Sequence, residues 1–325
     1  MVFTSLLRKT QRVPSWVVRA AIWGAYLGFL GLFLVLSHPD KGYDFLQHFR
    51  PTPSYAYPGW IAALLAPLGT LPPEIAFAIF MLSSAALLAA TALREGAVWL
   101  LVWPVSLYTL WVGNFTPWML FGAALGYRWW RQGNQYSLAL LPFALTLLKP
   151  HLILGFLLWL GIEVWRLRRW REAALVGGGL VGFAILTLAS GVPGSDYWQQ
   201  WFFQDGYSPL SILPVEIKVP LWGVGLALLG LWLWKRPSNE INFAAAWAWG
   251  VLLTPYFQVQ DLLFFAPALI LLVARDARWG ALILALGIAP WISVLLIPLL
   301  TSVASLGTLQ LSLRHAMRPT PVSRS

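Results

Sequence analysis

Long apolar segments dominate this sequence, and they constrain its fold more than any other feature. Of the 325 residues, 59% are hydrophobic and 10% are charged, whereas a soluble domain averages about a quarter charged residues. Because so few charges cannot cover a water-facing surface, we expect an all-α, polytopic transmembrane protein of about 10–12 helices, with one integral membrane domain over residues 1–325. The apolar segments lie at about 20–37, 75–93, 97–112, 117–127, 136–148, 152–165, 173–190, 219–234, 242–254, 262–274, 279–296 and 298–313.

The basic residues indicate how these segments are threaded through the membrane. If the segments cross alternately from a cytoplasmic N-terminus, 18 of the 22 Lys and Arg residues fall on the inner side. This bias agrees with the positive-inside rule and predicts a multi-pass plasma-membrane protein with both termini in the cytoplasm. The net charge of +10 then reflects topology, and a nucleic-acid partner is not expected. The basic residues on the outer side are Lys41, Arg50, Lys149 and Lys218.

Three helical hairpins are too short to cross a bilayer twice. Only 34 residues separate Arg131 from Arg166, whereas two spans need about 40 residues and a turn. The turn at residues 149–151 should therefore lie below the outer membrane surface. Two further short hairpins turn at 113–114 and 255–261. Irregular backbone at membrane depth needs protein or a water-filled cavity around it, so we expect a recessed, outward-facing cavity lined by these turns.

Two longer polar loops, residues 38–56 and 191–218, are expected on the same outer side and should form part of the same face. The first contains Asp40 and Asp44. A carboxylate near an apolar boundary can have its pKa raised by desolvation, which suits a general base. The alternative for each residue is a solvated loop acid or a helix N-cap.

Lys149 and His151 lie in the turn of the shortest hairpin. An ionisable group at membrane depth points to a function, and the ammonium of Lys149 would suit the phosphate of a lipid-linked ligand. Alternatively, Lys149 extends to the outer interface through its aliphatic chain. His151 could share the phosphate or shuttle a proton, or it could make a structural hydrogen bond to nearby backbone.

The other two short turns also carry polar side chains. Asp261 follows Gln258 and Gln260 in one turn, and Asn114 lies in the other. We expect these residues to line the cavity. The alternative is that Asp261 and Asn114 cap the helices that follow them.

Several kinds of chemistry have no support in the sequence. There are no cysteines, which excludes disulfides and thiolate catalysis. Nucleotide-binding and metalloprotease motifs are missing, and we expect neither a metal site nor a cofactor.

Four stretches between residues 38 and 275 share an order and a membrane placement with the motifs of a known family. They are Asp44; Tyr57-Pro58-Gly59 with the apolar run to Pro67-Leu68; Gly113-Asn114; and the pair Leu148-Lys149-Pro150 and Leu253-Thr254-Pro255, the latter followed by Asp261. Together they resemble the polytopic GT-C glycosyltransferases, most closely glycosyltransferase family 87, the polyprenyl-phosphate-mannose-dependent mannosyltransferases. Gly59 stands where that family has a second proline, and Asn114 stands where it often has glutamine.

The resemblance implies a GT-C-like fold and a membrane glycosyltransferase. Such an enzyme moves a sugar, in this family mannose, from a polyprenyl-phosphate donor to a lipid or glycan acceptor on the extracytoplasmic face. Asp44 would be the general base, with Asp40 as the second choice. The resemblance further implies donor-phosphate binding by Lys149, His151 and Arg50, and a cavity lined by Tyr57, Asn114, Gln258 and Asp261.

Two other functions fit the same composition. A polytopic transporter, or a flippase for lipids or lipid-linked sugars, would share the cavity and the charges at membrane depth. The sequence contains no clear internal repeat, whereas many transporters are built from repeats. The third possibility is a non-catalytic assembly subunit, which would not depend on Asp44 or Lys149.

Overall fold

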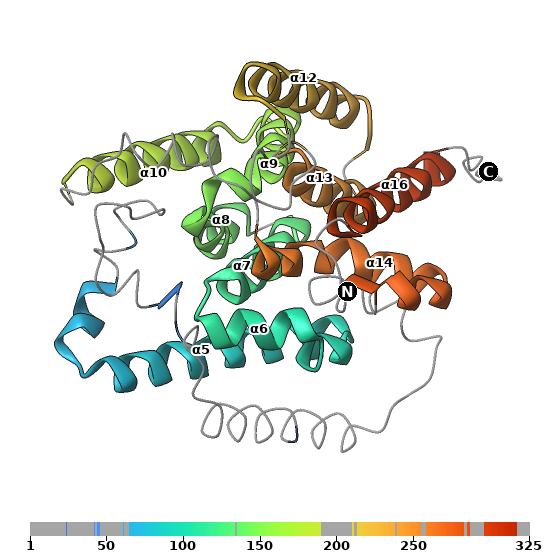
Figure 1. Ribbon diagram of the computed structural model, residues 1–325. Coiled ribbons are helices and arrows are strands. Elements are labelled where there is room, and N and C mark those ends of the chain that lie inside the picture. Colours follow the sequence, from blue (N-terminus) through green and yellow to red (C-terminus); the bar gives the residue numbers. More distant parts are fainter. Residues whose placement is uncertain are drawn as a thin grey trace.

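The computed structural model describes residues 65–133, 135–189, 213–237, 239–254, 258–282 and 296–316, together with positions 24, 42, 44–45, 61, 210 and 285–286. Within these ranges every regular element is helical, which confirms the all-α prediction (Figure 1). The α-helices are α5 (Pro73–Glu95), α6 (Pro104–Val112), α7 (Thr116–Arg131), α8 (Tyr136–Ala144), α9 (Leu154–Arg166), α10 (Trp170–Ala189), α12 (Val215–Trp234), α13 (Glu240–Leu252), α14 (Ala266–Arg275) and α16 (Leu296–Ala316).

Short 3₁₀-helices lie where the sequence predicts longer continuous segments. The expected segment 97–112 is divided into η2 (Val98–Leu101) and α6, which begins at Pro104. Proline favours the first turn of a helix, since its missing N–H needs no partner there. The remaining 3₁₀-helices are η1 (Ala66–Thr70), η3 (Leu145–Leu148), η4 (Pro150–Ile153), η5 (Val259–Phe265) and η6 (Ala277–Trp279).

One predicted boundary is wrong. The sequence places residues 191–218 in an outer loop, but α12 already begins at Val215, directly after Pro214. Lys218 therefore belongs to the helix and is buried. Most of that loop, all but positions 42 and 44–45 of the 38–56 loop, and most of the segments 20–37 and 279–296 lie outside the described residues.

Small residues bring helices into close contact at the centre of the bundle. A Cβ atom added to Gly155 of α9 would lie 2.0 Å from the Ala246 carbonyl oxygen and 2.7 Å from Gly250 Cα, both in α13. The backbones of α9 and α13 therefore touch directly, as is common where apolar helices associate in a membrane. The aromatic side chains of Phe156 and Trp247 pack beside this contact.

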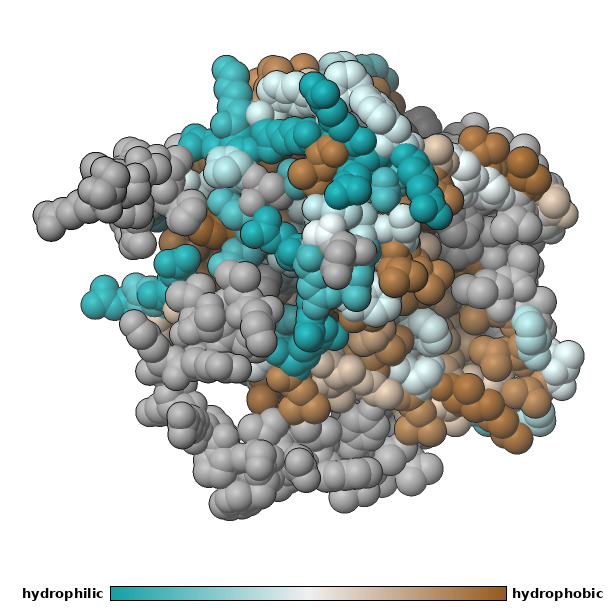
Figure 2. Space-filling model, turned by 180° about the vertical axis from the view of Figure 1, so that it is seen from behind, coloured by the Kyte–Doolittle hydropathy of each residue, from teal (hydrophilic) through white to brown (hydrophobic). Residues whose placement is uncertain are grey.

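Much of the outer surface is apolar. On α12, Leu228 is 61% exposed and Leu231 is 60% exposed, and few residues of this helix are buried. Apolar patches of this extent are unusual on soluble monomers. Among the helices that the structure describes, α5 and α12 are long and apolar enough to cross a membrane. Figure 2 shows hydrophilic residues gathered together on one side of the molecule, beside a broad area of hydrophobic residues.

Basic residues gather at one end of the helices. Glu240, the first residue of α13, lies within electrostatic range of Arg131 and Arg275, and Arg94 lies within range of Arg128. The Arg166 guanidinium at the end of α9 donates to the Leu233 and Trp234 carbonyl oxygens in the last turn of α12. We call this face the basic end; it comprises Arg94, Arg128, Arg131, Arg166 and Arg275, all in the last turns of their helices.

The close contact between α9 and α13 gives a first testable prediction. The variant Gly155→Ala should lower the stability of the protein by about 1–3 kcal/mol, because its methyl group has no room beside α13. The matched control is Gly161→Ala in the same helix, where no atom lies within 4 Å of an added Cβ. Thermal unfolding in detergent would measure both. Equal unfolding temperatures for the two variants would contradict the packing.

Candidate functional site

The backbone around Asp44 docks on the turn between α6 and α7. The Gly42 N–H donates to the Trp111 carbonyl oxygen at 2.9 Å, and Phe45 is fully buried. Gly113 has a φ of +76°, and a Cβ atom there would lie 2.6 Å from Phe45 Cβ. Glycine is therefore required at 113 both by its conformation and by this contact. The docking fixes the position from which the Asp44 side chain projects.

Asp44 is buried and accepts hydrogen bonds from two amides. Its side chain is 7% exposed, and its Oδ2 accepts from Asn114 Nδ2 at 2.5 Å and from Gln260 Nε2 at 3.1 Å. The Oδ1 of Asn114 in turn accepts from the backbone N–H and the hydroxyl of Thr116, at 3.0 and 2.7 Å. Asn114 therefore joins the start of α7 to the Asp44 carboxylate: its oxygen accepts the N–H of Thr116, the first residue of α7, and its nitrogen donates to Asp44.

Lys149 forms a buried ion pair with Asp261. The Lys149 Nζ donates to Asp261 Oδ1 at 2.6 Å, and the two side chains are 3% and 1% exposed. The second oxygen of Asp261 accepts the backbone N–H of Gln258 at 2.9 Å, as part of a capping box at the start of η5. Asp261 is therefore not the N-cap of the following helix but the third residue of a capping box whose N-cap is Gln258, and the same side chain is also the partner of Lys149.

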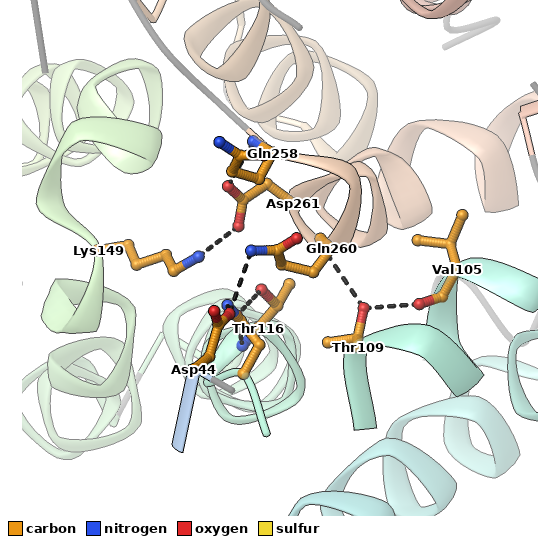
Figure 3. A network of polar contacts seen from close by, with 9 residues as sticks. Asp44, Val105, Thr109, Thr116, Lys149, Gln258, Gln260 and Asp261 are labelled. Atoms are coloured by element: carbon orange, nitrogen blue, oxygen red, sulfur yellow. Dashed lines mark hydrogen bonds and ion pairs between the residues drawn. The ribbon is translucent and has the colours of Figure 1, made fainter. Parts of the chain in front are cut away.

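Neighbouring residues of η5 connect the two carboxylates. Figure 3 shows the Gln260 side chain pointing toward Asp44 and the Asp261 side chain pointing toward Lys149. The Gln260 carbonyl oxygen accepts from the Thr109 hydroxyl of α6 at 3.3 Å. The three short turns expected at 113–114, 149–151 and 255–261 thus meet in one polar cluster, which comprises Asp44, Asn114, Lys149, Gln260 and Asp261.

Burial raises the pKa of the Asp44 carboxyl above its ordinary value. The positive charge of Lys149 and the hydrogen bonds from Asn114 and Gln260 act in the opposite direction, because they favour the ionised form. Asp44 is thus a carboxylate whose proton affinity is increased by desolvation while two amides orient it. This combination suits a group that must accept a proton.

The remaining predicted site residues differ in what the structure describes. His151 is buried in η4, within electrostatic range of Lys149. Asp40, Arg50 and Tyr57 lie outside the described residues. Sequence reasoning missed the contacts of Thr109 and Thr116, and it did not pair Lys149 with Asp261. The sequence contained one signal for this pairing, since the turn with Lys149 and the turn with Asp261 carry opposite charges.

No metal centre is formed by the described part of the chain, since no three His, Asp or Glu side chains lie close enough together there. A small apolar cavity of about 80 Å³ lies between α8, η3, α9 and α10. Its wall includes Thr146 and Leu147, close in the chain to Lys149.

The buried ion pair gives the second prediction. Lys149→Met should destabilise the protein by about 3–5 kcal/mol, because it leaves the Asp261 carboxylate buried without its counter-charge. The double variant Lys149→Met/Asp261→Asn should recover much of this loss, since asparagine is neutral and still accepts the Gln258 N–H. Thermal unfolding would compare the three proteins. A double variant no more stable than Lys149→Met would argue against the ion pair.

Comparison with known proteins finds no matching family model and no significant match among curated proteins or solved structures. The resemblance to glycosyltransferase family 87 therefore stays a prediction from the motifs.

Proposed function

We propose that this chain is a polytopic membrane glycosyltransferase that moves a sugar from a polyprenyl-phosphate donor to a lipid or glycan acceptor. The observation that carries the proposal is the polar cluster. In it, a buried carboxylate and a buried ammonium lie within electrostatic range of each other, and adjacent residues of η5 hold them. Transfer from a phosphate-linked sugar requires a base and, close to it, a cation that binds the phosphate.

The positions of the charges support an extracytoplasmic site. The polar cluster lies at the start of α7, and the last turn of α7 belongs to the basic end. The 16 residues of α7 rise about 24 Å at 1.5 Å each, less than the roughly 30 Å of a bilayer core, so the cluster would lie below the membrane surface that it approaches. If the basic end faces the cytoplasm, as the positive-inside rule favours, the cluster lies toward the opposite surface. The protein is then a multi-pass protein of the plasma membrane.

The proposed reaction is a displacement at the anomeric carbon. The acceptor hydroxyl oxygen attacks this carbon, Asp44 takes the hydroxyl proton, and the bond between the anomeric carbon and the phosphate oxygen breaks. Polyprenyl phosphate leaves with the bonding electrons. Lys149 would exchange Asp261 for the phosphate and stabilise the charge that it gains. Asp261 would hold the ammonium in place until the donor arrives.

The small apolar cavity cannot enclose an isoprenoid chain, but its lining offers an apolar surface along which the chain of a lipid-linked donor would lie. Its lining includes Leu140, Phe143 and Phe156, and it reaches η3, which ends at Leu148 directly before Lys149. An isoprenoid chain beside these residues would place its phosphate near the ammonium. In the same proposal His151 and Arg50 assist in phosphate binding, and Tyr57, Asn114 and Gln258 line the donor cavity.

Replacement of the proposed base gives the third prediction. Asp44→Asn should lower the release of polyprenyl phosphate from polyprenyl-phosphate mannose by about 10²- to 10⁴-fold, the usual contribution of a general base. Asparagine is nearly isosteric with aspartate, so insertion and thermal unfolding should change little. The matched control is Glu74→Gln, an exposed acid at the start of α5, which should retain full activity.

The assay also separates the proposed enzyme from its alternatives. A transporter or flippase for lipid-linked sugars would move the donor across liposome membranes without releasing polyprenyl phosphate. An assembly subunit would do neither. Full turnover by the Asp44→Asn protein would remove Asp44 from the role of base.

The environment of Asp44 gives the fourth prediction, on the pH dependence of transfer. Asp44 must be ionised to accept a proton, so the rate should fall as the pH is lowered through its pKa. Because burial raises this pKa, the fall should begin at a higher pH than it would for an aspartate with the ordinary pKa of about 3.9. Gln260→Met removes one hydrogen bond to the carboxylate and should move the acid limb to higher pH. An unchanged acid limb would contradict the contact.

A further inference from the structure

A polar cavity lies at the basic end, away from the residues assigned to transfer. Its volume is about 490 Å³, which is within the range of small-molecule sites. It lies where α14 ends and η6 packs against α16. Its lining residues are Arg275, Asp276, Arg278, Trp279, Gly307, Gln310 and Leu311.

Local contacts hold the turn that forms this cavity. The Asp276 carboxylate Oδ1 accepts the backbone N–H of Arg278 at 3.0 Å, and the Trp279 N–H donates to the Asp276 carbonyl oxygen at 3.1 Å. Gly307 of α16 leaves room for the indole, since a Cβ atom there would lie 2.8 Å from the ring of Trp279. The turn therefore places Arg275 and Arg278 in the wall of one cavity, beside an indole ring.

The charges of the lining favour an anion. Two guanidinium groups outweigh the single carboxylate of Asp276, one oxygen of which is used as a cap. Beyond the lining, Glu240 lies within electrostatic range of Arg275 but also of Arg131, so these two outer charges offset each other, and the carbonyl end of α14 removes only part of the remaining excess. Guanidinium groups bind phosphate through two parallel hydrogen bonds. The amide of Gln310 adds a neutral donor, and the indole ring of Trp279 suits the headgroup level of a membrane.

We infer that this cavity binds a phosphate group at the basic end, through Arg275 and Arg278 with Gln310. The phosphate is carried by the headgroup of an anionic phospholipid or is free in solution, and the two sources share the same chemistry. A lipid source follows from the proposed membrane placement, in which the basic end faces the anionic leaflet. The site is distinct from the polar cluster and does not depend on glycosyl transfer.

The test uses the full-length protein in nanodiscs of phosphatidylcholine with increasing phosphatidylglycerol. Thermal unfolding should shift upward with phosphatidylglycerol for the wild type. For Arg275→Gln/Arg278→Gln, the amount needed for half of this shift should rise about tenfold or more, because charge-assisted hydrogen bonds are lost. The matched control is Arg168→Gln/Arg171→Gln, which removes the same charge from exposed positions outside the cavity. It should behave as the wild type.

A second arm identifies the source of the phosphate. Inorganic phosphate is added to nanodiscs of phosphatidylcholine alone, with chloride at equal ionic strength as the reference. A shift that depends on Arg275 and Arg278 in this arm assigns the site to free phosphate, and a shift with phosphatidylglycerol only assigns it to lipid. Either result supports the site. No shift in either arm, or equal losses in both double variants, would overturn it.

A third variant covers the case in which the glutamine protein does not fold. Arg275→Lys/Arg278→Lys keeps both charges but loses the planar guanidinium forks. Its affinity for the phosphate group should be lower than that of the wild type. An unchanged affinity would overturn the assignment to the two guanidinium groups.

Discussion

The ion pair between Lys149 and Asp261 is the contact on which the arrangement of the polar cluster depends. Each ion loses several kcal/mol of hydration when it is buried, and only close contact with a counter-charge offsets that loss. The two residues are 112 positions apart, and both are almost fully buried. The turn before α9 must therefore lie against η5 whenever both side chains are charged. Because Gln260 precedes Asp261, the same constraint brings the Gln260 amide to Asp44.

The cluster also stabilises the irregular backbone around it. Turns in an apolar interior leave N–H groups that water cannot reach, and each needs a partner. Asp261 accepts the Gln258 N–H, and Asn114 accepts the Thr116 N–H. In Asp261 and in Asn114, one polar atom of the side chain accepts a backbone N–H at the start of a helix, and the other contacts a further member of the cluster. The second contact is with Lys149 for Asp261 and with Asp44 for Asn114.

The apolar pattern was sufficient to predict most of the described helices, but it predicted less of the site. Segments such as 75–93 and 242–254 became α5 and α13 within a few residues, since long apolar runs without proline have few alternatives to a helix. The 3₁₀-helices and the early start of α12 depend on prolines and on packing, which hydropathy does not report. Polar residues in three short turns were expected on one face, and Asn114, Lys149 and Asp261 do lie together. Their partners could not be predicted, because a pairing across 112 residues is decided by tertiary packing.

The charges of this chain are used differently at the two ends of α7. In the polar cluster, Asp261 neutralises Lys149, while uncharged amides hold Asp44 by hydrogen bonds. At the basic end, arginine is in excess and several of its side chains are exposed, so the charge remains available to partners outside the protein. A compensated ion pair responds to a ligand only when the ligand replaces one of the ions, which favours selective binding. An uncompensated surface attracts any anion, and selectivity there must come from shape, as in the cavity between α14 and α16. In the two proposals, the ends would therefore differ in how they select a phosphate, although both would use cationic side chains to bind it.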